Sequence, residues 1–288
     1  MNENNRYINI LEDNVLFLVK KKIPKGNGKF RDIFVGNEET KIFFKKVMNF
    51  LEKKYSDILS KNQCSHGFRK KRSAISNAMC HMKLERGYIL SIDIKDFFSS
   101  IKKDMLRDII SKKILDVCFI DDVLPQGLST SPVISNIVMC NIDHVIEKQL
   151  NSLGIKLDVN FCYSRYVDDL TISIYSDNVD DCFLKIQKKV HEMIKNILIF
   201  YGFYLNESKT KYGNLNDNFH VTGISLVNHG EPTRKTKRKL RAALYQKNYK
   251  SIIGLINWME SVGESPANKI LAGVATTEPI TPPLGGMA

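Results

Sequence analysis

Two adjacent carboxylates, Asp168 and Asp169, stand between two segments with the residue pattern of β-strands, and this feature constrains the fold more than any other. Segment 161–165 precedes the quartet Tyr-Val-Asp-Asp and segment 170–175 follows it, and both alternate β-branched or aromatic residues with small polar ones. The acids are therefore expected at the turn of a β-hairpin. Because aspartates also occupy turns for their backbone hydrogen bonds alone, the pair by itself leaves a structural and a chemical role open.

A third acid, Asp93, ends the apolar segment 87–92, which reads as a strand buried on both faces. If this strand neighbours the hairpin in one sheet, three carboxylates surround a site for two magnesium ions. Magnesium prefers hard oxygen ligands, and two ions about 4 Å apart can activate an attacking hydroxyl and neutralise a leaving pyrophosphate. Asp96 is excluded from this set, because a residue on a chain leaving the strand is expected to cap a helix or face solvent.

Between these acids lies Leu124-Pro125-Gln126-Gly127, followed by the helical pattern of residues 133–150. With these three motifs in this order, the chain resembles the reverse transcriptases. The resemblance implies an α+β right-hand polymerase with fingers, a palm of antiparallel sheet plus helices, and a helical thumb. It further implies that Asp93, Asp168 and Asp169 hold the two Mg²⁺ ions, that Gln126 and Gly127 border the incoming nucleotide, and that Tyr166 supports the primer end.

The fingers hairpin is expected in the basic segment 20–33, with its tip at residues 26–28, where Gly and Asn tolerate a positive φ. By resemblance, Arg31 and Lys25 bind the triphosphate of a dNTP, whereas the alternative is a solvated basic hairpin. Arg69, in a His-Gly-Phe-Arg match to the second fingers segment, is assigned to primer, template or RNA binding. Phe98 stands where the family places the aromatic that blocks a ribose 2'-hydroxyl, although a core aromatic is the alternative.

Lys209 belongs to a segment, residues 201–210, that resembles the motif following the catalytic turn in the family. Near a departing pyrophosphate, a lysine can act as a general acid or as a phosphate counter-charge, and we favour the counter-charge. A surface lysine without a catalytic role is the alternative.

Two fragments narrow the resemblance to the retron reverse transcriptases: Asn-Ala-Met-Cys-His at residues 77–81 and Val-Thr-Gly at residues 221–223. RNA contact by Asn77 and His81 is implied by this resemblance. It also implies a structured noncoding RNA as template and primer, priming from an RNA 2'-hydroxyl to give branched RNA–DNA (msDNA), and a role in antiphage defence with an effector protein.

The charge of the chain is consistent with a nucleic-acid partner, since 43 Lys and Arg face 31 Asp and Glu, a formal net charge of +12. Much of the excess opens a predicted helical stretch that runs from residue 234 toward residue 258 and resembles a thumb helix, with a solvated helix face as the alternative. The cations assigned there to primer, template or RNA contact are Arg234, Lys235, Lys237, Arg238 and Arg241. The expected divisions are 1–92 for the fingers and the start of the palm, 93–230 for the palm, and 231–288 for the thumb and a tail.

Several classes are disfavoured by what the sequence does not contain. No apolar run approaches the roughly 20 residues that a bilayer demands, and no Cys-x-x-Cys pair points to zinc or a disulfide framework, so we expect a cytoplasmic protein without a membrane partner. Prolines and glycines in segment 276–288 exclude a helix there. Two rival functions stay open: a reverse transcriptase of another lineage, either intron-like or diversity-generating, and a non-catalytic RNA-binding scaffold on the same fold.

Overall fold

A computed structural model of the chain describes residues 5–11, 14–26, 28–82, 87–176, 183–215, 217, 219–226 and 234–260. The strands are β1 (Asn5–Leu11), β2 (Asn14–Gly26), β3 (Lys29–Gly36), β4 (Tyr88–Asp93), β5 (Asn160–Tyr166), β6 (Asp169–Tyr175), β7 (Lys211–Asn214), β8 (His220–Val221) and β9 (Ile224–Ser225). The helices are α1 (Glu38–Lys54), α2 (Ser56–Lys61), α3 (Ala74–Met82), α4 (Phe97–Ser100), α5 (Lys112–Cys118), α6 (Thr130–Leu157), α7 (Phe183–Phe200), α8 (Arg234–Tyr245) and α9 (Tyr249–Glu260), with short 3-10 helices at Lys103–Leu106 and Glu207–Lys209. Segment 276–288 lies outside the described residues.

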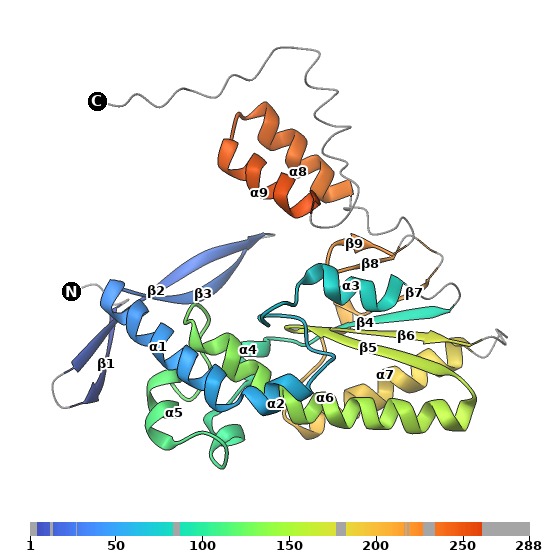
Figure 1. The fold of residues 1–288 in the computed structure, drawn as a ribbon, viewed down its shortest axis with the longest axis horizontal. Helices are drawn as coiled ribbons and strands as arrows, with labels where there is room; N and C mark the ends of the chain where they lie inside the picture. The colour runs from blue at the N-terminus through green and yellow to red at the C-terminus, as the bar shows by residue number, and fades with distance from the viewer. Residues whose placement is uncertain are drawn as a thin grey trace.

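The palm is a four-stranded antiparallel sheet in the order β5-β6-β4-β7. Helices α6 and α7 cover one face, while α3 and the β8–β9 hairpin cover the other (Figure 1). Alternation along β4 explains both contacts, because Leu90 and Ile92 enter the large core with α6 and α7, whereas Ile89 packs in a second core with α3, β8 and β9. The expected strand buried on both faces is confirmed.

The fingers hairpin forms as expected, with β2 and β3 paired antiparallel and Gly28 at φ +70° in the turn. Strand β1 extends this sheet on the other side of β2 (Figure 1). Asn27, at the predicted tip, lies outside the described residues. The mixture of helices with antiparallel sheets agrees with the predicted α+β fold.

The thumb stretch differs from the prediction of one helical run from residue 234 toward residue 258. Helix α8 stops at Tyr245, and α9 starts again at Tyr249 and packs back against it (Figure 1). Lys247 takes φ +51°, and the Asn248 side chain accepts the Ser251 N–H at 3.1 Å, as an N-cap does. Folding back lets the pair bury Leu240 and Met259, which a single extended helix could not do for itself.

The expected boundary between residues 92 and 93 falls inside β4, and the three divisions stay predictions. None of the helices that the structure describes is long and apolar enough to cross a bilayer.

Candidate active site

The acidic pair lies at a tight hairpin turn, as its flanking residues indicate. Tyr166 pairs with Asp169, which leaves Val167 and Asp168 as the two turn residues. Val167 has φ +63°, a left-handed conformation that glycine normally supplies in two-residue hairpins. For a β-branched residue this conformation costs on the order of 1–3 kcal/mol, so the surroundings must hold the turn.

Strand β4 brings the third acid to the same edge of the sheet. Asp93 and Asp169 are direct partners in the antiparallel β4–β6 register. The backbone N–H of Ile94 donates to the carbonyl of Asp168 at 2.9 Å, which ties the turn to the end of β4. The expectation that the strand and the hairpin are neighbours is therefore confirmed.

The three carboxylates disturb one another electrostatically. Burial, followed by the charges of Asp168 and Asp93, raises the pKa of Asp169 to about 6. Burial and the Asp93 charge also raise the pKa of Asp168. Negative charge therefore accumulates at this edge, and a cation beside it would be stabilised.

The cation that the structure places there is the ammonium of Lys209, whose Nζ lies 3.0 and 2.8 Å from the two carboxylate oxygens of Asp93. Its hydrogen bond to Asp93 raises the pKa of Lys209. The 3-10 helix that carries this lysine is tied to β4, since Asn206 N–H donates to the Asp93 carbonyl at 2.8 Å. The predicted residue Lys209 thus contacts Asp93, and its charge also acts on Asp168 and Asp169.

A divalent metal fits the chemistry of these residues. Carboxylate oxygens are the ligands that magnesium prefers, and both oxygens of Asp93 already face a cationic group. Among the described residues, however, no three acidic or other ligating side chains converge closely enough to enclose an ion by themselves. Asp96 takes the N-cap position of α4 and is exposed, apart from the set.

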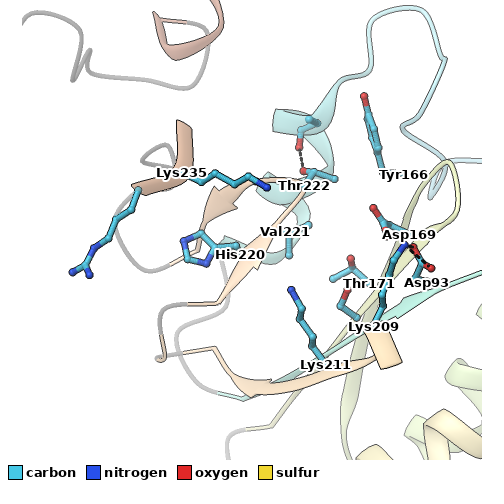
Figure 2. Close-up of a pocket in the computed structure, with 14 residues that line it drawn as sticks. Asp93, Tyr166, Asp169, Thr171, Lys209, Lys211, His220, Val221, Thr222 and Lys235 are labelled. Atoms are coloured by element: carbon cyan, nitrogen blue, oxygen red, sulfur yellow. Dashed lines mark hydrogen bonds and ion pairs between the residues drawn. The ribbon is translucent and has the colours of Figure 1, made fainter. Parts of the chain in front are cut away.

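A pocket of about 860 Å³ opens beside the carboxylates and runs to the β8–β9 turn and the start of α8. Figure 2 shows Lys211 and Lys235 reaching into this space from different elements, with Asp93 and Asp169 on its other side. Tyr166 also lines the pocket. The pocket therefore has basic side chains on one side and the carboxylates on the other.

The aromatic predicted to restrict the sugar, Phe98, lies half-buried in an aromatic cluster. Its ring centroid is 5.4 Å from that of Phe97 and 6.5 Å from that of Phe68. Phe68 comes from the second fingers segment and is itself exposed. Phe98 is therefore held by aromatic neighbours from both the palm and the fingers.

The Leu-Pro-Gln-Gly segment holds the base of the fingers hairpin. Phe34 N–H, in β3, donates to the Gln126 carbonyl at 2.8 Å. Gly127 has φ +103°, and a Cβ at this position would stand 2.4 Å from the Phe34 carbonyl oxygen. Only glycine permits this close approach.

The predicted fingers cations differ in their surroundings. Arg31 is exposed on β3, and its positive charge offsets a small part of the rise in the pKa of Asp168 that burial causes, so Arg31 acts on the carboxylate cluster through its charge. Lys25 is exposed near the hairpin tip. Arg69 is half-buried, and its Nη1 donates to the Asn62 carbonyl at 3.4 Å. Its guanidinium is therefore less available for the predicted contact with primer, template or RNA.

The predicted thumb cations lie along α8. Arg234 and Lys235 line the pocket at the start of this helix. Further along, Arg238 and Arg241 are exposed and Lys237 is half-buried. The basic face of α8 therefore continues outward from the pocket.

The structure contradicts direct RNA contact by the side chains of Asn77 and His81, because both are fully buried. His81 bridges strands β5 and β6 of the hairpin that carries Asp168 and Asp169, with Nδ1 2.7 Å from Ser173 Oγ and Nε2 2.7 Å from Ser164 Oγ. Burial, and then the charge of His66, lowers the pKa of His81 to about 3, so the ring is neutral at physiological pH. His81, for which the resemblance implied RNA contact, instead packs α3 onto the sheet.

Helix α3, which carries Asn77 and His81, packs against the hairpin that carries the Val-Thr-Gly segment. The hydroxyl of Thr222, in the β8–β9 turn, donates to the Ala74 carbonyl at the start of α3, at 2.7 Å. Thr222 lines the pocket beside the carboxylates, as Figure 2 shows. In the unit formed by α3 and the β8–β9 hairpin, the β8–β9 turn therefore faces the pocket, whereas Asn77 and His81 are buried.

Sequence reasoning missed a buried polar network behind the turn that carries Asp168. Arg165 and Asp143, with side-chain exposures of 0% and 1%, form an ion pair at 2.8 Å. Gly67 packs directly on the turn, since a Cβ there would stand 2.6 Å from Val167 N. Two sequence signals for this network were available. One is the arginine immediately before the quartet, and the other is the aspartate on the apolar face of a helix.

Comparison with known proteins agrees with this geometry. The family described as "Reverse transcriptase (RNA-dependent DNA polymerase)" matches residues 23–226. The Retron Ec86 reverse transcriptase of Escherichia coli is 27% identical over 220 residues, which cover 73% of this chain and 62% of that protein. The Retron Ec73 reverse transcriptase of the same organism is 32% identical over 193 residues, covering 59% of each. The chain thus matches about three-fifths of the length of these relatives.

Among solved structures, the apo telomerase of Candida tropicalis, truncated from its C-terminal domain, superposes with a TM-score of 0.53 at 18% identity. The match covers 74% of this chain and 54% of that one, and at this identity it supports the fold alone. Together with the family match over most of the chain, the carboxylate edge and its pocket identify the chain as a member of the reverse transcriptase family that is similar to the retron type.

Proposed function

We propose that the chain is an RNA-directed DNA polymerase of the retron type. The observation that carries the proposal is the gathering of Asp93, Asp168 and Asp169 at one edge of the palm sheet, beside a pocket with basic walls. Such an edge suits phosphoryl transfer, in which a primer hydroxyl attacks the α-phosphate of a dNTP.

In this proposal, Asp93, Asp168 and Asp169 would hold two Mg²⁺ ions, which would supply activation of the primer hydroxyl and charge neutralisation at the leaving pyrophosphate. Lys209 releases Asp93 and serves as a counter-charge to phosphate. Arg31 and Lys25 bind the triphosphate, while Gln126 and Gly127 border the nucleotide. Phe98 restricts the sugar, and its contact with Phe97 keeps it in place.

The template strand and primer strand lie along the basic elements. Tyr166 supports the primer end from the rim of the pocket, and Arg69 is a further RNA contact. The cations of α8 contact phosphates, which requires only charge and position. These thumb cations are Arg234, Lys235, Lys237, Arg238 and Arg241.

The retron resemblance refines the substrate. The template is a structured noncoding RNA, an RNA 2'-hydroxyl primes synthesis, and the product is branched RNA–DNA (msDNA) that serves antiphage defence together with an effector protein. Sequencing the nucleic acid that copurifies with the protein, before and after RNase treatment, tests this refinement. A short DNA joined covalently to RNA supports it, whereas extension of generic primed RNA without such a product favours another lineage.

The polymerase assignment itself is tested with a double change of Asp168 and Asp169 to Asn. We expect loss of dNTP incorporation on primed RNA with RNA binding retained, because the basic contacts remain. Asp96→Asn is the matched control, since it removes a nearby exposed acid outside the set. If the double variant still incorporates dNTPs, the catalytic assignment is overturned. If the wild-type protein binds RNA but incorporates no dNTPs, the alternative of a non-catalytic RNA-binding scaffold is supported.

A further inference from the structure

Arg165 places its guanidinium directly beneath the catalytic turn. Its Nη1 donates to the Val167 carbonyl at 3.0 Å. This carbonyl belongs to the peptide that joins Val167 to Asp168. Its position therefore fixes where the backbone of Asp168 begins. The same Val167 has the left-handed backbone that is unfavourable for a β-branched residue.

The rest of the guanidinium is fixed by buried partners. Asp143, on α6, accepts from Nε at 2.9 and 3.0 Å and from Nη2 at 2.8 Å. Nη2 also donates to Ser65 Oγ at 3.1 Å and to Asn136 Oδ1 at 3.2 Å. Any rotation of the planar guanidinium would break at least one of these hydrogen bonds. The Nη1 that donates to the Val167 carbonyl is therefore held in a single position.

The acid that anchors the arginine is itself fully engaged. Asp143 accepts from Asn62 Nδ2 at 2.7 Å and from the Tyr163 hydroxyl at 2.8 Å. The backbone of Arg165 is tied as well, since its N–H donates to the Cys64 carbonyl and its carbonyl accepts from His66 N–H, both at 2.8 Å. The side chain and the main chain of Arg165 are thus both immobilised next to the turn.

We propose that Arg165 is a positioning residue for the metal-binding carboxylates, and that it acts by holding the Val167 carbonyl so that Asp168 and Asp169 keep their places opposite Asp93. The inference rests on the proposed polymerase function. A buried ion pair that served folding alone would need no donor on the turn. Partners that orient metal ligands typically change metal affinity or activity by about 10–100-fold when they are removed.

The first test is Arg165→Lys, which keeps the charge but cannot bind Asp143 through two nitrogens and reach Val167 at once. We expect apparent Mn²⁺ affinity, measured by electron paramagnetic resonance without nucleic acid, to fall about tenfold. The Mg²⁺ concentration for half-maximal dNTP incorporation should rise by a similar factor, with RNA affinity unchanged. Leu150→Ala is the control, because it destabilises the same helix α6 in the main core, about two turns along the helix from Asp143.

A double-variant cycle tests the route. Glycine accepts a positive φ without strain, so in a Val167→Gly background the turn should depend less on the arginine. There, Arg165→Lys should lower Mn²⁺ affinity by less than about threefold relative to Val167→Gly alone. An equal loss in both backgrounds would refute a route through Val167.

The outcomes separate the inference from the proposed function. The positioning role is overturned if Arg165→Lys binds Mn²⁺ as tightly as wild type does. It is also overturned if Leu150→Ala loses as much Mn²⁺ affinity as Arg165→Lys does. If Arg165→Lys does not fold, Ser65→Ala removes one acceptor while keeping the ion pair, and it should weaken Mn²⁺ binding by about threefold; no change there also overturns the role. A wild-type protein that binds Mn²⁺ but incorporates no dNTP refutes the polymerase proposal alone.

Discussion

The crowding of negative charge at the palm edge predicts that a substitution which abolishes activity will stabilise the metal-free protein. Burial and the neighbouring acids Asp168 and Asp93 raise the pKa of Asp169 from 3.8 to about 6. Asn keeps the shape of the side chain and removes its charge. Asp169→Asn should therefore unfold at a higher temperature than wild type at pH 7.5 when metal is removed.

The size of the effect follows from the pKa. One unit corresponds to about 1.4 kcal/mol, so a pKa about two units too high makes ionised Asp169 cost at most about 3 kcal/mol. Because the carboxyl is partly exposed, solvent screening reduces this cost to about 1–2 kcal/mol. For a chain of 288 residues, that free energy corresponds to a rise in Tm of roughly 2–6 °C.

The pH dependence has a defined sign. Below about pH 3.8 both the folded and the unfolded state bind the Asp169 proton, so the carboxyl costs nothing. Between about 3.8 and 6, the unfolded state releases the proton first, and wild-type stability falls as the pH rises. The Tm advantage of Asp169→Asn should therefore be small near pH 4 and complete by pH 7.5.

Thermal unfolding followed by circular dichroism in EDTA, at several pH values, measures this difference. Asp96→Asn serves as the control, because its exposed side chain lies apart from the cluster. Adding Mg²⁺ should raise the Tm of wild type more than that of the variant, since ligands stabilise the state that binds them. The electrostatic reasoning would be refuted if the variant were no more stable than wild type at pH 7.5. A Tm difference between variant and wild type that does not change with pH would refute it as well.

Three further substitutions test contacts around the site. Gly67→Ala places a Cβ 2.6 Å from Val167 N and should displace the turn, so we expect dNTP incorporation to fall about 100-fold with RNA binding retained; a wild-type rate would show that the turn tolerates the shift. Phe98→Ala should raise incorporation of ribonucleotides relative to deoxyribonucleotides by about tenfold or more in competition assays, and an unchanged ratio would assign Phe98 to the core alone. Gly127→Ala places a Cβ 2.4 Å from Phe34 O and should raise the KM for dNTPs about tenfold by displacing the fingers; an unchanged KM would contradict that coupling.

The strands that carry the three aspartates could be predicted, because their signals are local. Alternation on either side of the Tyr-Val-Asp-Asp quartet placed β5 and β6, and an apolar run ending in Asp93 placed β4. Neighbouring positions in the sheet then followed from the chemistry that the acids require. The thumb was less predictable, because the stop at Tyr245 depends on Lys247 adopting a left-handed backbone and on the packing of α9 against α8.

The supporting residues could not be predicted, because their partners are distant in sequence. His81 finds Ser164 and Ser173 only once β5 and β6 have paired and α3 has packed on them. A histidine on a short helix has the same local pattern whether it faces RNA or a sheet. Arg165 likewise meets Asp143 only after α6 has packed beneath the sheet.

The hydrogen bond from Thr222 to the Ala74 carbonyl has a consequence for exchanging parts between relatives. It joins segments 148 positions apart, one from α3 and one from the β8–β9 turn, into a single surface element beside the pocket. A chimera that takes only one of these segments from a relative would set a foreign turn on a native helix. Substrate preference should therefore transfer intact only when both segments move together, as one module.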